Sequence, residues 1–256
     1  MTMSYVKKIS DQLLKKSWKN ITINKLKVIL QDHIESWYND NKLYKLVYNL
    51  KNRWVLIELK QWFYMIWSWK DSVDADINDD EYRYMLCKYV KSRIGKNWMI
   101  TGTKALELSL QNREISDHIY ILTNGIVGTE KLYHGKTIWF RSYNQSKQSI
   151  YKSFSKYSQK LIIADKKINV ACIELSILET LNEGDLSDMR YQVEIIKKML
   201  AKSRKPYDLD KIAQIVKIGK HHTAINKLYK LASSVDKSLA KQIFDIIKRY
   251  SYTIKI

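Results

Sequence analysis

Hydrophobic and polar residues recur with a helical period in two short stretches near the N-terminus, residues 24–30 and 42–50. In the second stretch, four apolar residues are spaced i, i+3, i+4 and i+7, which places them on one face of a helix. These residues are Leu43, Leu46, Val47 and Leu50. The spacing therefore predicts two consecutive amphipathic helices.

Two apolar runs, residues 54–57 and 62–66, follow the second predicted helix, and the polar residues 58–61 separate them. Such a pattern predicts a β-hairpin. Helix, helix and hairpin in this order indicate a winged helix-turn-helix over residues 1–70, because a helix about 10–12 Å in diameter fits a major groove about 12 Å wide. The alternative is that helix and hairpin only cover a core.

Cationic, amide and aromatic residues lie on or beside the polar face of the second helix and in the expected hairpin turn. We expect the lysines and arginine to contact phosphates, and tyrosine and asparagine to lie nearer the base edges. The candidate DNA-binding residues are Lys42, Tyr44, Lys45, Tyr48, Asn49, Lys51, Asn52, Arg53, Lys60 and Gln61.

The clearest boundary is residues 71–81, which hold six acids and no base. We expect an acidic linker here. Its Asp74-x-Asp76-x-Asn78 spacing imitates a calcium loop, but the sixth and twelfth positions are Asp79 and Met85 instead of glycine and glutamate. Residues 82–256 then alternate helical and strand patterns and end in a helical tail over about 182–256. The fold class expected is α+β: a winged helix-turn-helix followed by a mixed α/β domain with a helical C-terminus.

Charge supports a polyanionic partner. The formal net charge is +19, and the basic excess lies on both sides of the acidic strip. A field of this sign favours nucleic acid through counterion release. The N-terminus lacks a signal-peptide pattern, and no apolar run approaches the ~20 residues of a membrane-spanning helix. We therefore expect a cytoplasmic protein with no membrane partner.

Candidate catalytic and metal-binding groups are sparse. Cys87 and Cys172 lie in apolar patterns that favour inert core thiols. His118 lies in an apolar strand pattern, where a buried, hydrogen-bonded histidine is expected. His221 and His222 open a basic helix, for which solvent exposure is the default expectation. We expect no metal, no cofactor and no catalytic residue.

A second basic segment, residues 141–160, has five cations, no acid and interleaved aromatic residues. Its cations are Arg141, Lys147, Lys152, Lys156 and Lys160. This composition suits phosphate contact with base stacking. An ordinary polar strand and loop, with its aromatic side chains facing the core, explains it equally well.

Three pieces of the chain resemble the AbiEi-type antitoxins, the transcriptional-regulator halves of type IV toxin–antitoxin pairs. They are residues 43–66, 98–106 (Trp-Met-Ile-Thr-Gly-Thr-Lys-Ala-Leu) and 163–179, a hairpin that leads into a leucine-rich helix. The chain departs from the usual family pattern at Lys60-Gln61, where an Arg-Gly turn is common, and at Lys104 and Glu179, where Ser and Asp are common.

This resemblance implies a DNA-binding antitoxin and transcriptional autorepressor without catalysis of its own. Its partners would be double-stranded operator DNA and a nucleotidyltransferase-type toxin that it opposes. Because a single small module buries only about 600–1,000 Å² on DNA, we also expect a cooperative dimer on an operator with inverted repeats.

Two alternatives remain open. One is a degenerate nucleotidyltransferase-like enzyme, because Gly102-Thr103 followed by Asp117 imitates the motif of that class, although Ile119 replaces the second carboxylate of Asp-x-Asp. The other is a general nucleic-acid-binding accessory protein of a plasmid, virus or defence system.

Overall fold

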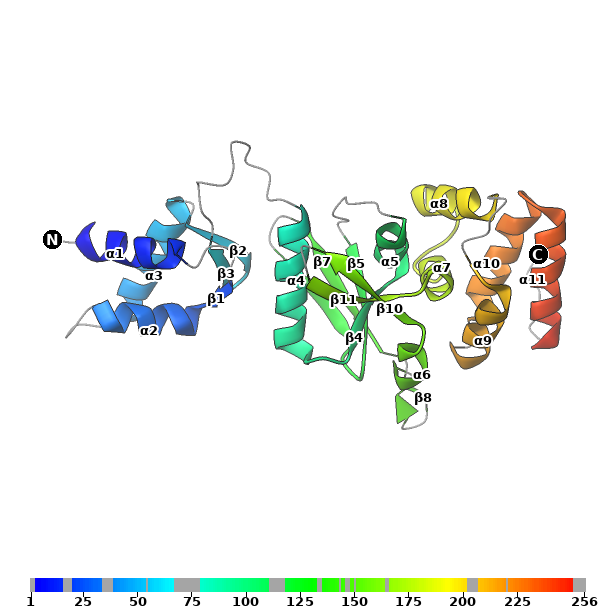
Figure 1. Cartoon of the computed structure of the whole chain (residues 1–256), viewed down its shortest axis with the longest axis horizontal. Coiled ribbons are helices and arrows are strands. Elements are labelled where there is room, and N and C mark those ends of the chain that lie inside the picture. The colour runs from blue at the N-terminus through cyan, green and yellow to red at the C-terminus, as the bar shows by residue number, and fades with distance from the viewer. Residues whose placement is uncertain are drawn as a thin grey trace. The chain divides into compact units, whose positions relative to one another are not determined.

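The structure is a computed structural model of the chain and has a mixed α+β fold (Figure 1). It describes residues 3–15, 20–33, 39–53, 55–66, 79–110, 118–132, 135–142, 144–145, 148–149, 151–163, 166–201, 207–219 and 221–250. The chain divides into two compact units. The N-terminal unit comprises Met1–Arg93 with Lys131–Gly135, and the C-terminal unit comprises Ile94–Glu130 with Lys136–Ile256. None of the helices within the described ranges is long and apolar enough to cross a membrane.

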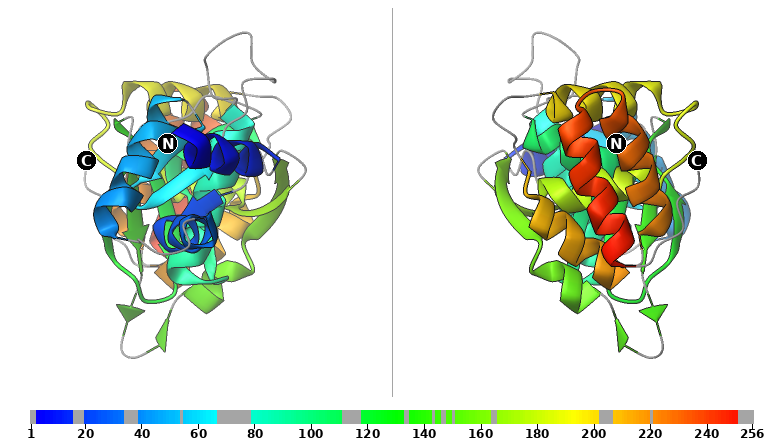
Figure 2. Two further views of the ribbon diagram at one scale, coloured as in Figure 1. Left: turned by 90° about the vertical axis from the view of Figure 1, so that its left-hand side faces the viewer. Right: turned by 90° about the vertical axis from the view of Figure 1, so that its right-hand side faces the viewer.

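The N-terminal unit consists of helices packed with a small antiparallel sheet of strand order β1-β3-β2. Its elements are α1 (Met3–Leu14), β1 (Asn20–Thr22), α2 (Ile23–His33), α3 (Asp40–Asn52), β2 (Leu56–Lys60), β3 (Phe63–Ile66) and α4 (Asp79–Ile94, of which Ile94 belongs to the C-terminal unit). Helices α1, α2 and α3 contact one another (Figure 2, left). Strand β1 pairs with β3, which joins the segment between α1 and α2 to the hairpin after α3.

Helix α3 forms where the periodicity predicts a helix. Its four-residue apolar stripe is buried in the core of the unit, together with Val6, Ile9 and Leu13 of α1 and Leu26 and Leu30 of α2. The Asn39 side chain caps α3 by accepting a hydrogen bond from the backbone N–H of Lys42 at 2.9 Å. Helix α1 was not predicted, although Val6, Ile9 and Leu13 have the spacing of an apolar helical face.

The hairpin forms after α3, but its turn lies later than predicted. Strand β2 runs to Lys60, so that the residues expected in the turn, 58–60, belong to the strand. The turn is Gln61-Trp62, and Trp62 has a positive φ of 66°. The prediction was wrong because Leu59 is 1% exposed and keeps the chain against the core. Lys60 therefore projects from a strand and not from the tip.

Helix α4 begins within the segment predicted as an acidic linker, residues 71–81. Residues 71–78 lie outside the described part of the chain, and 79–81 begin the helix. The Tyr89 ring of α4 meets the Phe63 ring of β3 edge-on, with centroids 5.3 Å apart. This contact attaches α4 to the sheet of the N-terminal unit.

The C-terminal unit is built on a six-stranded mixed sheet of order β10-β11-β4-β5-β7-β6. Its strands are β4 (Trp98–Thr101), β5 (His118–Thr123), β6 (Gly128–Lys131, of which Lys131 belongs to the N-terminal unit), β7 (Thr137–Arg141), β10 (Ser158–Ile163) and β11 (Lys166–Ala171). A separate pair comprises β8 (Asn144–Gln145) and β9 (Gln148–Ser149). Strands β10 and β11 form the predicted hairpin. Strands β11 and β4 run parallel, as do β5 and β7.

Helices α5 (Gly102–Ser109) and α7 (Ile173–Leu181) pack against each other beside this sheet. The other helices are α6 (Tyr151–Ser155), α8 (Arg190–Leu200), α9 (Leu209–Gly219), α10 (His222–Ser233) and α11 (Lys237–Arg249). Figure 2 (right) shows α10 and α11 side by side. Helix α10 also packs on α7, so the helical tail closes over the central helix pair.

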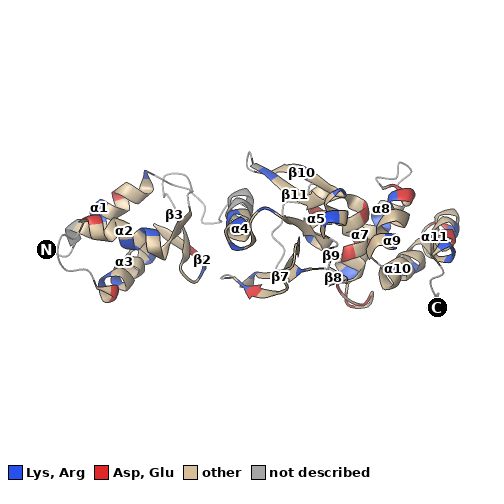
Figure 3. Ribbon diagram, turned by 90° about the horizontal axis from the view of Figure 1, so that it is seen from below, with Lys and Arg blue, Asp and Glu red and all other residues tan. Residues whose placement is uncertain are grey.

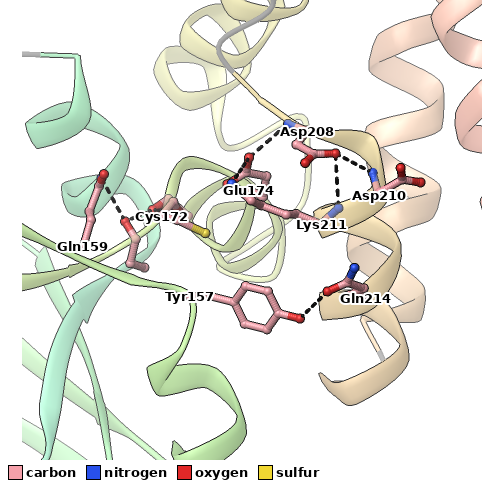
Figure 4. A network of polar contacts seen from close by, with 10 residues as sticks. Tyr157, Gln159, Cys172, Glu174, Asp208, Asp210, Lys211 and Gln214 are labelled. Carbon is pink, nitrogen blue, oxygen red and sulfur yellow. Dashed lines mark hydrogen bonds and ion pairs between the residues drawn. The ribbon is translucent and has the colours of Figure 1, made fainter.

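A polar network fixes α9 against α7 (Figure 4). The buried Glu174 carboxylate accepts a hydrogen bond of 2.9 Å from the backbone N–H of Asp208, and Asp208 in turn accepts one from the N–H of Asp210. At the other end of the network, the Tyr157 hydroxyl donates to Gln214 of α9 at 3.1 Å. These contacts position α9 against α7.

Candidate nucleic-acid interface

The outward face of α3 carries several of the residues predicted to contact DNA. Tyr44, Lys45 and Tyr48 are exposed, and Tyr48 retains 65% of its accessible surface. Lys51, Asn52 and Arg53 are exposed at the end of the helix, whereas Lys42 and Asn49 are half-buried. Because the opposite face is buried in the core, α3 separates an apolar side from a side with aromatic, cationic and amide groups.

The hairpin turn lies next to this face. The Trp62 and Tyr44 rings are 5.5 Å apart between centroids, in a tilted arrangement. The backbone carbonyl of Trp62 accepts a hydrogen bond of 3.0 Å from the N–H of Ile23, the first residue of α2. Turn, α2 and α3 are thus held together. Trp62 is part of this surface but was not among the predicted site residues, because it was assigned to a strand.

Lys51 and Lys60, both predicted to contact DNA, interact with other side chains of the protein. The Lys51 ammonium forms an ion pair with Glu58 of β2, and the Lys60 ammonium lies 5.4 Å from the Tyr89 ring centroid. In the ribbon of Figure 3, Lys and Arg positions occur along both units, and Asp and Glu positions occur among them. Lys45, Arg53 and Gln61 are exposed on the N-terminal unit.

The second basic segment does not form one surface. Arg141 ends β7, whereas Lys160 lies on β10, and three strands separate β7 from β10 in the sheet. At about 4.8 Å per strand these positions are roughly 19 Å apart. Lys152 and Lys156 are exposed near α6, and Lys147 lies outside the described residues. Phe154 and Tyr157 of this segment are buried, as expected for an ordinary strand and loop.

A carboxylate occupies the start of α5. Glu183 accepts hydrogen bonds from the backbone N–H of Thr103 at 3.0 Å and from the Thr103 hydroxyl at 2.6 Å. Gly102 has a φ of +64°, and a Cβ at this position would lie 1.8 Å from a Glu183 oxygen. Glycine is therefore required here, and Thr103 binds a carboxylate that lies 80 residues later in the chain. The observed N-cap of α5 is Thr101.

Burial raises the pKa of Glu183 to about 7, although the hydrogen bonds from Thr103 and the charge of Arg141 lower it. The Arg141 guanidinium lies over the Tyr120 ring, 4.1 Å from its centroid, and 3.6 Å from a Glu179 oxygen. Arg141 is thus held by an aromatic ring and a buried carboxylate.

The histidines differ from their expected positions. His118 is exposed at the start of β5, although its apolar neighbours predicted burial. His221 is buried, and its Nε2 lies 2.7 Å from a Glu179 oxygen that is equally buried. The prediction failed at His221 because its partner is on α7, 42 residues earlier. Local patterning cannot reveal such a contact.

Two cavities in the C-terminal unit lie near the start of α10, and Arg141 lines one of them. Val127, Arg141, Ser142, Asn182 and Thr223 line one of about 460 Å³. Thr223 also lines a second cavity of about 460 Å³. Its other lining residues are Asp185, Leu186, His222, Asn226, Lys227 and Lys230. The first cavity has one cation in its lining, Arg141, and the second has Lys227 and Lys230 together with the carboxylate of Asp185.

The described ranges contain no group of three or more His, Cys, Asp or Glu side chains that could hold a metal ion. Cys87 and Cys172 are free thiols of intermediate exposure, and burial raises the pKa of each to about 12. Asp117, the carboxylate of the alternative enzyme motif, lies outside the described residues.

Comparison with known proteins shows similarity at the level of fold. No family model matches the chain, and no curated protein matches it. Among solved structures, the chain is similar to the crystal structure of the RV2827C protein from Mycobacterium tuberculosis, with a TM-score of 0.62 and 10% sequence identity. The match covers 99% of this chain and 83% of that one.

Proposed function

We propose that this protein is a sequence-specific DNA-binding repressor that reads duplex DNA with α3. The observation that carries the proposal is the division of α3 into a fully packed apolar face and a face with exposed Tyr44, Lys45, Tyr48 and Asn52. A polar outer face is normal for a surface helix, but solvation does not require two exposed tyrosines on it, Tyr44 and Tyr48. Its aromatic and cationic groups are suited to base edges and phosphates in a major groove.

The element order of the N-terminal unit supports a winged helix-turn-helix. A strand between the first two helices pairs with the hairpin that follows the third, and this hairpin would act as the wing. Its Gln61-Trp62 turn is joined to the start of α2 and to Tyr44. A DNA contact made by this turn would therefore depend on how α3 is positioned in the groove.

The physiological role that we propose is that of a type IV antitoxin and autorepressor. The family resemblance in residues 43–66, 98–106 and 163–179 supports this role. The toxin partner would be a nucleotidyltransferase, opposed without catalysis by this chain. The Glu183 carboxylate at the start of α5 favours this proposal over an enzyme, because it occupies the helix N-terminus at which that motif would hold a nucleotide phosphate.

The test compares binding of the full-length protein to the duplex upstream of its own coding sequence and to a random duplex of equal length. Lys45→Ala is expected to weaken both complexes alike and to reduce the salt slope by about one, because lysine contacts phosphate. Asn49→Ala is expected to cost roughly 1–3 kcal/mol on the specific duplex and less on the random one. Fluorescence anisotropy across a salt series measures both effects.

Lys241→Ala is the matched control, because Lys241 is exposed on α11 in the other unit. It removes the same charge and is expected to leave duplex affinity and salt slope nearly unchanged. Equal losses for Lys45→Ala and Lys241→Ala would show that binding reflects only net charge and would contradict the proposal for α3.

A further inference from the structure

The parallel strands β5 and β7 present a mixed aromatic and cationic face in the C-terminal unit. His118 pairs with Thr137 and Tyr120 with Trp139, and Arg141 follows two residues after Trp139. Since side chains alternate along a strand, these five residues share one face of the sheet. The other face is apolar and buried at Ile119, Ile121, Ile138 and Phe140.

Trp139 is unusual for a central strand position because 41% of its surface is exposed. Its ring stacks beside that of Tyr120, with centroids 6.0 Å apart and an interplanar angle of 27°. The Arg141 guanidinium covers the Tyr120 ring at 4.1 Å. The three side chains are thus ordered by one another, and part of the indole still faces solvent.

An aromatic ring fixed on a sheet face is the element with which many proteins stack unpaired bases. A nucleotide also requires a cation near its phosphate. Arg141, whose guanidinium also lies 3.6 Å from a Glu179 oxygen, is on the same face and lines the neighbouring cavity of about 460 Å³ with Ser142 and Thr223. The second cavity is lined by Lys227 and Lys230 together with Asp185, which lies 3.8 Å from the Lys227 ammonium.

We propose that this face binds an unpaired nucleobase on Trp139, with the phosphate of the same or the adjoining nucleotide near Arg141. The ligand is a free nucleotide or one residue of a single-stranded nucleic acid, which present the same chemistry. This site is independent of duplex binding by α3, because its residues all belong to the C-terminal unit.

The experiment titrates full-length protein against labelled single-stranded RNA and DNA decamers and against a labelled duplex. Trp139→Ala is expected to weaken single-strand binding roughly tenfold, the size typical of losing one base stack. Trp139→Phe retains a ring and is expected to remain near the wild-type affinity. Duplex binding is expected to be unchanged in both variants, whereas Trp62→Ala is expected to weaken only duplex binding.

Ile162→Ala is the control within the same sheet, because Ile162 is 71% exposed on β10, at the edge of the sheet. It is expected to leave single-strand affinity unchanged. Competition with ATP, CTP, GTP and UTP separates the two ligand sources. Displacement of the decamers by one of these at comparable concentration identifies a nucleotide site, and displacement by unlabelled decamers alone identifies a single-strand site.

A 4-thiouracil-substituted strand crosslinked to wild-type protein provides a test that needs no variant, and mass spectrometry is expected to find the crosslink in the β5 or β7 peptides. Wild-type affinity of folded Trp139→Ala for both the decamers and the four nucleotides would overturn the proposal. Equal loss in Trp139→Ala and Trp139→Phe would also overturn it, as would crosslinks confined to the N-terminal unit.

Discussion

At the residue scale, the most informative contact is that of Glu183 with the first turn of α5. The helix N-terminus and Arg141 favour the ionised carboxylate, whereas burial opposes it, and burial has the larger effect on the pKa. In the folded state this group therefore holds its proton up to about pH 7, well above the ordinary value of 4.5.

This shift predicts a pH-dependent stability. A folded-state pKa above that of the unfolded chain contributes stability that is complete below about pH 4.5 and is lost as the pH rises through 7. Glu183→Gln keeps an acceptor for Thr103 but cannot ionise. Between pH 5 and pH 8 its free energy of unfolding should therefore rise relative to wild type by about 1–3 kcal/mol.

Urea unfolding at both pH values measures this difference. Glu194→Gln is the control, because Glu194 is exposed on α8, and its difference from wild type is expected to remain constant with pH. A constant difference for Glu183→Gln as well would show that the carboxylate is ionised across the whole range.

The contacts of Glu183 and of the histidines could be predicted from the sequence only in part. Gly102-Thr103 was recognised as resembling a phosphate-binding motif, but Glu183, which accepts hydrogen bonds from Thr103, is 80 residues away in the sequence. His118 and His221 were misassigned for the same reason: burial depends on elements that pack from elsewhere in the chain. Trp62 and Trp139 read as strand positions, and their exposure is a property of the tertiary fold.

At the scale of elements, the sequence predicts most of what the structure contains. Periodicity identified α2, α3 and the C-terminal helices, because their apolar stripes lie on one buried face. The alternating helical and strand patterns of residues 82–256 predicted the mixed α/β architecture, including the β10–β11 hairpin. The turn of the β2–β3 hairpin was misplaced, because Glu58 and Lys60 are polar but continue the strand. Polarity alone does not mark a turn.

Side-chain caps provide a test of the elements in each unit. Asn39 caps α3, and Asp236 caps α11 by accepting hydrogen bonds from Ser238 and Leu239. Asn39→Ala and Asp236→Ala are each expected to cost about 1 kcal/mol. Hydrogen exchange is expected to accelerate in the unit that carries the change and to remain unchanged in the other.

Asp245→Ala, which removes an exposed charge within α11, is the control for charge loss and is expected to have a smaller effect. If Asn39→Ala accelerated exchange in α11 as much as in α3, the two units would be one cooperative structure and this expectation would be wrong.

At the scale of the whole molecule, we propose that duplex binding belongs to the N-terminal unit. A single small module buries only about 600–1,000 Å² on DNA and binds weakly. Tight binding would therefore need either added contacts from the basic residues of the C-terminal unit or a second copy on an inverted repeat, and we propose the second copy. The half-site centres would lie about 10–10.5 base pairs apart, or a multiple of that distance, so that both α3 helices reach the same side of the duplex.

Selection of duplexes from a random pool by the full-length protein tests this claim most directly. We expect enrichment of an inverted repeat with that spacing, and loss of enrichment when about five base pairs, half a turn, are inserted between the half-sites. Asn49→Ala should blur the selected sequence, and Trp139→Ala should leave it intact. A pool without an enriched motif, or a motif with affinity insensitive to the insertion, would contradict the model of a cooperative repressor.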